Sequence, residues 1–145
     1  MSCIFCDIVA GKAPASVVYE DEQALIILDL FPVREGHALI LPKQHEQYVE
    51  RLDDELAAHL LHLARRLVRA QQAAGLRADA NNLLINNGAA ANQHVPHVHL
   101  HVIPRLKGDT LSRAFVWATR LLNVFGMQRR RARLDALAAR LAAVF

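Results

Sequence analysis

Residues 97–103 read His-Val-His-Leu-His-Val-Ile, a strict alternation of imidazole and apolar side chains that favours a β-strand. Successive side chains of a strand point to opposite faces, so His97, His99 and His101 share one face and the intervening residues share the other. The strand rise places neighbouring histidines about 6.5 Å apart. Four of the 8 histidines lie between residues 94 and 101, which makes this segment the first candidate for a functional site.

Three interpretations of this imidazole face remain open from the spacing alone. The histidines could bind a metal ion, since imidazole is a common zinc ligand. One histidine could be a nucleophile that the others orient. The face could also be a polar, solvated strand surface without chemistry.

The other apolar patterns predict an α+β fold, with an antiparallel sheet of about five strands, one long helix across it and a C-terminal helix. The long helix is predicted over 53–75, because Asp53 suits an N-cap, leucines recur on one face from Leu56 to Leu67, and Gly75 suits a C-terminal stop. Regular strand–helix–strand alternation is missing, which argues against a doubly wound sheet. Strands are predicted at residues 17–19, 24–28, 37–41, around 83–85 and at 98–103.

Composition indicates a globular, single-domain protein. The chain has 145 residues, 53% of them hydrophobic and 21% charged, which is enough for one domain with its own core. No apolar run approaches the roughly 18 residues that span a bilayer, and the N-terminus lacks the features of a secretory signal. Two cysteines spaced Cys-x-x-Cys suit a metal or a redox pair better than a disulfide framework. We therefore expect a cytoplasmic protein with no membrane partner.

The charge of the chain divides at Arg105. Residues 1–104 hold 8 basic and 12 acidic side chains, whereas residues 105–145 hold 9 and 2. We expect a domain over 1–104 and a basic, mostly helical extension over 105–145 that packs on it, divided near Gly126. The favoured interpretation is a basic helix docked on an acidic body, and a nucleic-acid contact is the other. The last helix is expected to bury three leucines and expose three arginines: Leu134, Leu137 and Leu141, and Arg130, Arg131 and Arg140.

The alternation and its surroundings resemble the histidine-triad (HIT) family of nucleotidyl transferases and hydrolases, whose signature is His-φ-His-φ-His-φ-φ with φ apolar. The resemblance covers roughly residues 3–104 and is greatest to the small bacterial branch related to purine-nucleoside phosphoramidases. Further landmarks are Ile4-Phe5-Cys6-x-Ile8-x-x-Gly11-x-x-Pro14, Val18-Tyr19-Glu20-Asp21, Leu28-Asp29, Gly36-His37-x-Leu39-Ile40-x-Pro42-Lys43-x-His45, and Asn86-Asn87-Gly88 followed by Gln93.

The resemblance implies a HIT-like hydrolase that acts at the α-phosphorus of a nucleoside 5′-phosphoramidate, which is a nucleotidylated amine. His99 is the implied nucleophile, and water then resolves its nucleotidyl-histidine intermediate to the nucleoside monophosphate. His101 is expected to contact phosphate oxygens, His97 to orient the nucleophile, and His37 to support the triad from a neighbouring strand. A neutral imidazole suits this role near pH 7 because its ordinary pKa is about 6.5.

The resemblance also implies contacts to a purine nucleotide. Asp29 matches a carboxylate that binds the ribose hydroxyls, and Asn86 matches a polar contact near the scissile phosphate. Two positions depart from the family pattern, because Asn92 stands where glycine is usual and His94 where Ser or Thr is usual. The expected nucleotide-binding residues are Phe5, Ile8, Leu28, Asp29, Leu30, Asn86, Gln93, His94, His99 and His101, with Phe5, Ile8, Leu28 and Leu30 near the apolar slot for the base.

The implied mechanism requires no cofactor, but the resemblance also implies a structural zinc ion. Some members of the branch form a closed tetrahedral site from four residues that are all present here: Cys3, Cys6, His45 and His97. His94 is a competing fourth ligand. The alternative is a pair of reduced thiols, with His45 capping a turn. The family usually forms a two-fold dimer, so we expect a homodimer.

Two alternatives to phosphoramidate hydrolysis stay open. One is hydrolysis of dinucleoside polyphosphates, which differs in the leaving group. The other is a zinc-stabilised, nucleotide-binding interaction protein with weak catalysis, favoured by the changed residues 92–94 and opposed by the intact triad. His59 and His62 are expected to be solvated helix residues. Phe115, Trp117 and Phe125 are expected to be packing or dimer contacts.

Overall fold

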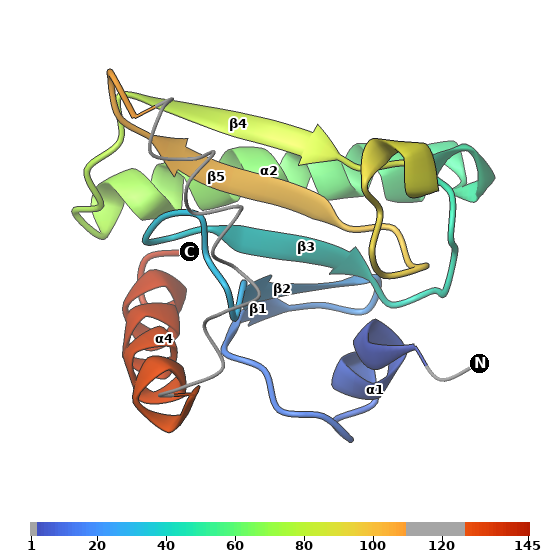
Figure 1. Ribbon diagram of the computed structural model, residues 1–145, viewed down its shortest axis with the longest axis horizontal. Helices are drawn as coiled ribbons and strands as arrows, with labels where there is room; N and C mark the ends of the chain where they lie inside the picture. The colour runs from blue at the N-terminus through green and yellow to red at the C-terminus, as the bar shows by residue number, and fades with distance from the viewer. Residues whose placement is uncertain (1–2, 110–126) are drawn as a thin grey trace.

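The predicted strands pair into one antiparallel sheet in the order β1-β2-β3-β5-β4, which confirms the α+β class (Figure 1). The computed structural model describes residues 3–109 and 127–145. Strand β5 lies between β3 and β4 rather than at an edge, and α1 was not expected from the sequence. The elements are α1 Ile4–Val9, β1 Val17–Glu20, β2 Ala24–Leu28, β3 Ala38–Pro42, α2 Asp54–Ala73, β4 Ala80–Ile85, β5 Leu100–Arg105 and α4 Met127–Ala142, with 3-10 turns at Val49–Arg51 and Ala89–Ala91.

The two faces of the sheet pack against different helices. Helix α2 lies behind the sheet in Figure 1, and on its side the apolar residues of the histidine segment join the larger core cluster: Val98, Leu100 and Val102. Phe5 of α1 covers part of the opposite face in a smaller apolar cluster: Leu25, Ile27, Leu39 and Leu41. The Phe5 ring also contacts His97 and His99, so the imidazoles occupy the α1 side of the sheet.

Helix α2 forms as its sequence predicts. The side chain of Asp53 accepts a 2.7 Å hydrogen bond from the backbone N–H of Leu56, which satisfies one of the unpaired donors of the first turn. The leucine stripe is buried in the core through Leu67. Beyond the helix, Gly75 has a φ of +74°, a left-handed conformation that glycine adopts without a steric penalty.

Strand β5 begins at Leu100, two residues later than predicted. Ile40 of β3 pairs with Leu100, and continuing that register would place Pro42 opposite Val98. Proline has no N–H to donate to a ladder, so the pairing ends there. Val98 instead donates its N–H to the carbonyl of Glu46 at 2.7 Å. The segment that precedes β5 is therefore free of the ladder on the β3 side, and it carries two of the three imidazoles.

Helix α4 packs beside β1 and buries its three predicted leucines (Figure 1). Arg140 is exposed as expected, but Arg130 and Arg131 are half-buried. The guanidinium of Arg130 lies 5.2 Å from the centre of the Phe31 ring, and Arg131 donates to Ser16 Oγ at 3.4 Å. The predicted break near Gly126 and the aromatic residues Phe115, Trp117 and Phe125 lie outside the described residues. Within the described ranges, no helix is both long enough and apolar enough to cross a membrane.

Candidate active site

Four histidines that the sequence predicted as site residues come together at the N-terminal end of β5. The rings of His99 and His101 have centres 4.8 Å apart, and His37 lies 5.2 Å from His101 on the other side. All are buried, and His97 is 0% exposed. The centre of the Phe5 ring lies 5.1 Å from that of His99, with the rings tilted by 63°, and Phe5 completes the wall on the α1 side. A solvated polar face is therefore excluded.

Hydrogen bonding sets the proton position on His99. Its Nδ1 lies 2.7 Å from the backbone carbonyl oxygen of His97. A carbonyl only accepts, so the neutral ring carries its proton on Nδ1 and donates it there. The lone pair is consequently on Nε2. The residue that the resemblance assigns as nucleophile thus has one nitrogen fixed and the other in its nucleophilic form.

His101 has the opposite tautomer, imposed through His37. The N–H of Val33 donates to Nδ1 of His37 at 3.2 Å, which places the ring proton on Nε2. That Nε2–H donates to Nδ1 of His101 at 3.0 Å, so the proton of His101 is on its own Nε2. A buried ring that presents N–H is suited to stabilising charge on a phosphoryl oxygen. The site therefore pairs a bare nitrogen on His99 with a donor on His101.

Asp29 adds a buried carboxylate behind His37. Its Oδ2 lies 3.5 Å from His37 Nδ1, and its Oδ1 accepts from the N–H of Phe31 at 2.8 Å. The backbone N–H of Asp29 also donates to the carbonyl of His37 at 3.0 Å, which closes residues 29–37 into a loop. Because Nδ1 of His37 already accepts from Val33, Asp29 is a charged neighbour of the ring, and the hydrogen-bonded chain runs from Val33 through His37 to His101.

The two cysteines meet two histidines on the far side of His97. Nδ1 of His97 lies 3.5 Å from Cys3 Sγ, 3.6 Å from Cys6 Sγ and 3.3 Å from Nδ1 of His45. A tetrahedral zinc ion with ordinary bond lengths separates its ligands by about 3.6 Å for nitrogen–sulfur pairs and about 3.4 Å for nitrogen pairs. The donor atoms of all four residues lie within 4.8 Å of one another, close enough to bind one such ion together.

The protonation of this cluster also suits a metal. Nε2 of His97 lies 2.9 Å from the carbonyl oxygen of Pro42, to which it donates, and this leaves the lone pair on the Nδ1 that faces the thiols. Burial lowers the pKa of His97, so the ring stays neutral. Burial and the neighbouring Cys3 raise the pKa of the Cys6 thiol, so a cation is what would favour its thiolate.

The loop before the triad uses Gln93 as a clamp. Its side-chain oxygen accepts from the N–H of Gly88 at 2.8 Å, and its amide donates to the carbonyl of Gln47 at 2.8 Å. Both ends of this predicted nucleotide contact are thus engaged with backbone. Asn86 donates from Nδ2 toward the carbonyl of Asn92 at 3.5 Å, and Asn92 has a φ of +61°. Asn92 therefore keeps the left-handed backbone that the glycine usual in the family would adopt.

The predicted apolar slot is only partly assembled. Phe5 and Ile8 belong to the cluster on the α1 face, but Leu28 is buried in the α2-side core and Leu30 packs against that same core. Side chains alternate along β2, so Ile27 rather than Leu28 shares the face of Phe5. The alternation of side chains between the two faces of a strand, applied to residues 24–28, would have identified Ile27.

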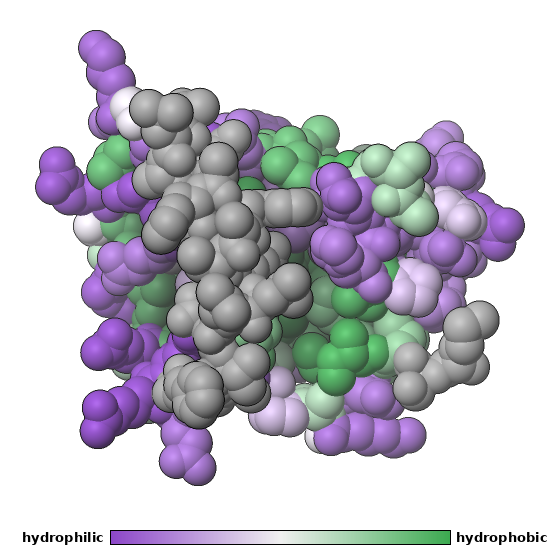
Figure 2. Space-filling view, viewed as in Figure 1, coloured by the Kyte–Doolittle hydropathy of each residue, from purple (hydrophilic) through white to green (hydrophobic). Residues whose placement is uncertain are grey.

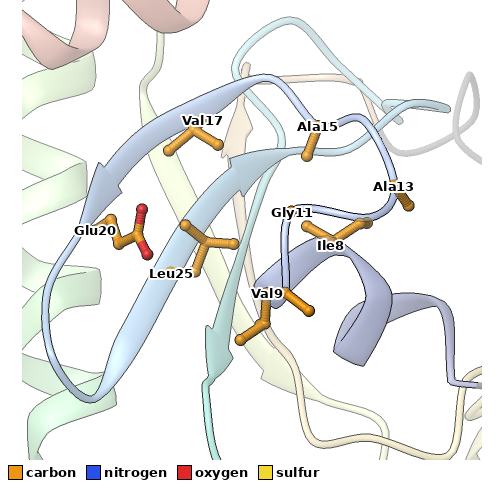
Figure 3. A pocket seen from close by; sticks show the side chains of 9 residues that line it. Ile8, Val9, Gly11, Ala13, Ala15, Val17, Glu20 and Leu25 are labelled. Atoms are coloured by element: carbon orange, nitrogen blue, oxygen red, sulfur yellow. The ribbon is translucent and has the colours of Figure 1, made fainter.

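Two cavities adjoin α1. One of about 450 Å³ lies between α1 and the β1–β2 hairpin, with Ile8, Val17 and Leu25 in its walls; Ile8 is its one predicted nucleotide contact (Figure 3). The other, of about 280 Å³, lies between α1 and the loop before the triad and is lined by Cys3, Ile4, Asp7, His94, Val95 and Pro96. Exposed His94 thus borders a hollow next to the cysteine–histidine cluster.

The histidines of α2 take no part in this site. Nε2 of His59 lies 2.8 Å from Oδ2 of Asp21, and the two groups tie α2 to the β1–β2 turn. Burial opposes ionisation of Asp21, but the N–H groups of Gln23 and Ala24 and the ring of His59 outweigh it and lower its pKa. His62 is exposed and stacks on His59 with ring centres 6.4 Å apart. His59 is therefore a half-buried structural partner rather than a solvated residue.

Comparison with known proteins agrees with this geometry. A sequence model described as the HIT domain matches residues 10–108. An uncharacterised HIT-like protein of Mycobacterium tuberculosis is 47% identical over 112 residues, which cover 77% of each chain. A Schizosaccharomyces pombe protein named adenosine 5′-monophosphoramidase is 41% identical over 105 residues, which cover 72% of this chain and 75% of that one.

The same comparison holds for solved structures. The crystal structure of a Zn-bound histidine triad family protein from Mycobacterium smegmatis is 40% identical to this chain. The match has a TM-score of 0.75 and covers 100% of this chain and 99% of that one. The similarity therefore extends over the sheet, the helices and the C-terminal segment.

The left-handed conformation of Asn92 gives a testable consequence. Replacing it by alanine should lower the free energy of unfolding by about 1 kcal/mol, because a Cβ without a locally bonding side chain disfavours this conformation. Asn92→Gly is the matched control and should be at least as stable as the native chain. Urea unfolding of the three proteins measures the difference. Equal stability of the alanine and glycine variants would mean that residue 92 does not hold a positive φ.

Proposed function

The chain belongs to the histidine-triad family, and on this premise we propose that it is a hydrolase of nucleoside 5′-phosphoramidates that releases the nucleoside monophosphate. The observation that supports this most is the pair of opposite tautomers. His99 presents a bare Nε2, and His101 presents an Nε2–H beside it, as their hydrogen bonds to His97 and His37 require. A nucleophile and an oxyanion donor on neighbouring rings are what displacement at phosphorus needs.

The proposed reaction has two balanced steps. Nε2 of His99 forms a bond to the α-phosphorus, the phosphorus–nitrogen bond breaks, and the leaving amine takes a proton from solvent or from His94. Water then attacks phosphorus, loses a proton to solvent, and displaces Nε2 of His99, which regains its lone pair. The carbonyl of His97 holds the Nδ1–H throughout and balances the positive charge of the intermediate. Two in-line displacements predict retention of configuration at phosphorus.

The name of the fission-yeast relative supports an amine as the leaving group. The base would lie on the α1 face against Phe5, Ile8 and Ile27, and Asp29 would bind the ribose. Asp29 would then lie between the ribose and the buried ring of His37, whose Nδ1 is 3.5 Å from its Oδ2. Dinucleoside polyphosphates are the alternative substrates, to be tested if phosphoramidates are not hydrolysed.

Removing the nucleophile tests this function. His99→Ala should lower turnover of adenosine 5′-phosphoramidate by roughly a thousandfold or more, as loss of a covalent catalyst does elsewhere. His62→Ala removes an exposed histidine on α2 and is the matched control, expected to keep native turnover. Release of adenosine monophosphate is followed by chromatography. An active His99→Ala protein, or net inversion at phosphorus, would exclude the two-step mechanism.

We further propose that Cys3, Cys6, His45 and His97 hold one structural zinc ion. When bound, the ion supplies a cross-link between the N-terminal segment and the triad. Metal analysis of protein prepared without chelator should give one zinc per chain, and a strong chelator should lower the melting temperature by about 5 °C or more. The double variant Cys3→Ser, Cys6→Ser should contain no zinc and show no chelator effect. Metal-free native protein would contradict the assignment.

We also propose a homodimer formed along β4. Helix α4 flanks the β1 edge of the sheet, whereas within the described residues no element covers the outer edge of β4. Leu83 of β4 is 41% exposed, and Leu61 of α2 is 52% exposed. Light scattering at micromolar concentration should give twice the chain mass, and Leu83→Lys should shift it toward one chain. Val17→Lys on β1 is the control and should remain dimeric; a monomeric native protein would refute the proposal.

A further inference from the structure

Helix α4 is attached to the domain by its apolar face. Four of its side chains are buried in the main core: Leu134, Leu137, Ala138 and Leu141. Polar contacts to Ser16 add to this, since its Oγ donates to Asp135 Oδ1 at 2.5 Å and accepts from Arg131 at 3.4 Å. Past its C-terminal end, Arg66 of α2 donates to the carbonyl of Phe145 at 3.1 Å and stacks on its ring. Attachment therefore combines apolar burial, these hydrogen bonds and the stacking of Arg130 on Phe31.

The arginines on the outer side of α4 take no part in this attachment. Arg129, Arg133 and Arg140 are exposed and lie at i, i+4 and i+11, which is a single stripe about 16 Å long. Among the described residues, no carboxylate lies within ion-pair distance of any of them. The docking face of this basic helix is mainly apolar, and these three arginines face outward.

The charges of the rest of the chain make the basic character of α4 stand out. The sole acidic residue of α4 is Asp135, and its carboxylate accepts from Ser16. Residues 1–104 are net acidic, so a polyanion would be repelled from most of the domain and attracted to the basic extension. Hydrophilic side chains project from the left edge of the molecule, on the side where α4 lies (Figure 2).

We propose that this arginine stripe binds the phosphate backbone of a nucleic acid without reading its sequence. The exposed residues interleaved with these arginines include three small ones, Ala132, Ala136 and Ala139. A protein partner needs aromatic or large apolar anchors, and a membrane-surface helix needs an apolar face to insert. Helix α4 has already buried its apolar face. The alanines between the arginines are small, so phosphates can approach the helix closely. Each guanidinium can then donate two hydrogen bonds to one phosphate.

The test is binding of the full-length protein to a fluorescent single-stranded DNA of about 20 nucleotides, measured by anisotropy. If each of the three arginines contacts one phosphate, log Kd should rise with the logarithm of the salt concentration with a slope of about 2. The triple variant Arg129→Gln, Arg133→Gln, Arg140→Gln should weaken binding by roughly tenfold or more and flatten the slope. Its turnover of phosphoramidate should be unchanged, since the stripe is separate from the triad.

The matched control removes three other exposed charges by Lys12→Gln, Arg77→Gln and Lys107→Gln, and should bind as the native chain does. Equal losses in the two triple variants would overturn the proposal, because net charge alone would then explain binding. No binding by the native chain at low salt would also overturn it. Equally tight binding of polyglutamate would do so as well, since the partner would be any acidic polymer.

Discussion

Burial of three imidazoles along β5 and the segment that leads into it is the constraint from which the rest of the site follows. A buried ring must be oriented by hydrogen bonds, because a buried polar group without a partner is costly. His97 donates to the carbonyl of Pro42, His99 donates to the carbonyl of His97, and His101 accepts from His37. Each hydrogen bond sets whether one ring nitrogen carries the proton, and this decides whether the other nitrogen is a donor or has a free lone pair. The result is a metal-facing lone pair, a nucleophilic lone pair and a donor, in that order along the chain.

The backbone around the triad makes these bonds available. Pro42 cannot donate to the sheet, so the ladder ends there and its carbonyl accepts from an imidazole instead. On the other side, Gly36 has a φ of +86°, and a Cβ there would lie 2.7 Å from Leu76. The loop that delivers Asp29 and His37 therefore requires glycine at this position. Arg130 of α4 stacks on Phe31 in the same loop, which links the C-terminal helix to the site.

Most of the fold was predictable because its signals are local. Each signal comes from residues that are close together in the sequence: the N-cap at Asp53, the leucine stripe of α2 and the alternation of the histidine segment. The start of β5 was predicted two residues too early, because the effect of Pro42 acts between strands that are far apart in the sequence. Leu28 stays a predicted base contact, although its side chain lies in the α2-side core. Gln93 matched a family landmark, yet both ends of its side chain bind backbone.

The sequence by itself determined which residue types are present, their periodicity, and hence the helix, the strands and the imidazole face. Only the tertiary structure decided which of them meet. Cys3 and His97 are separated by 94 residues, and their 3.5 Å contact exists because α1 packs on the face of the sheet beside β5. The same holds for the tautomers of His99 and His101, because a ring proton is placed by whichever donor or acceptor folding brings to it. Periodicity is a property of neighbouring residues, whereas contact and protonation depend on the folded chain.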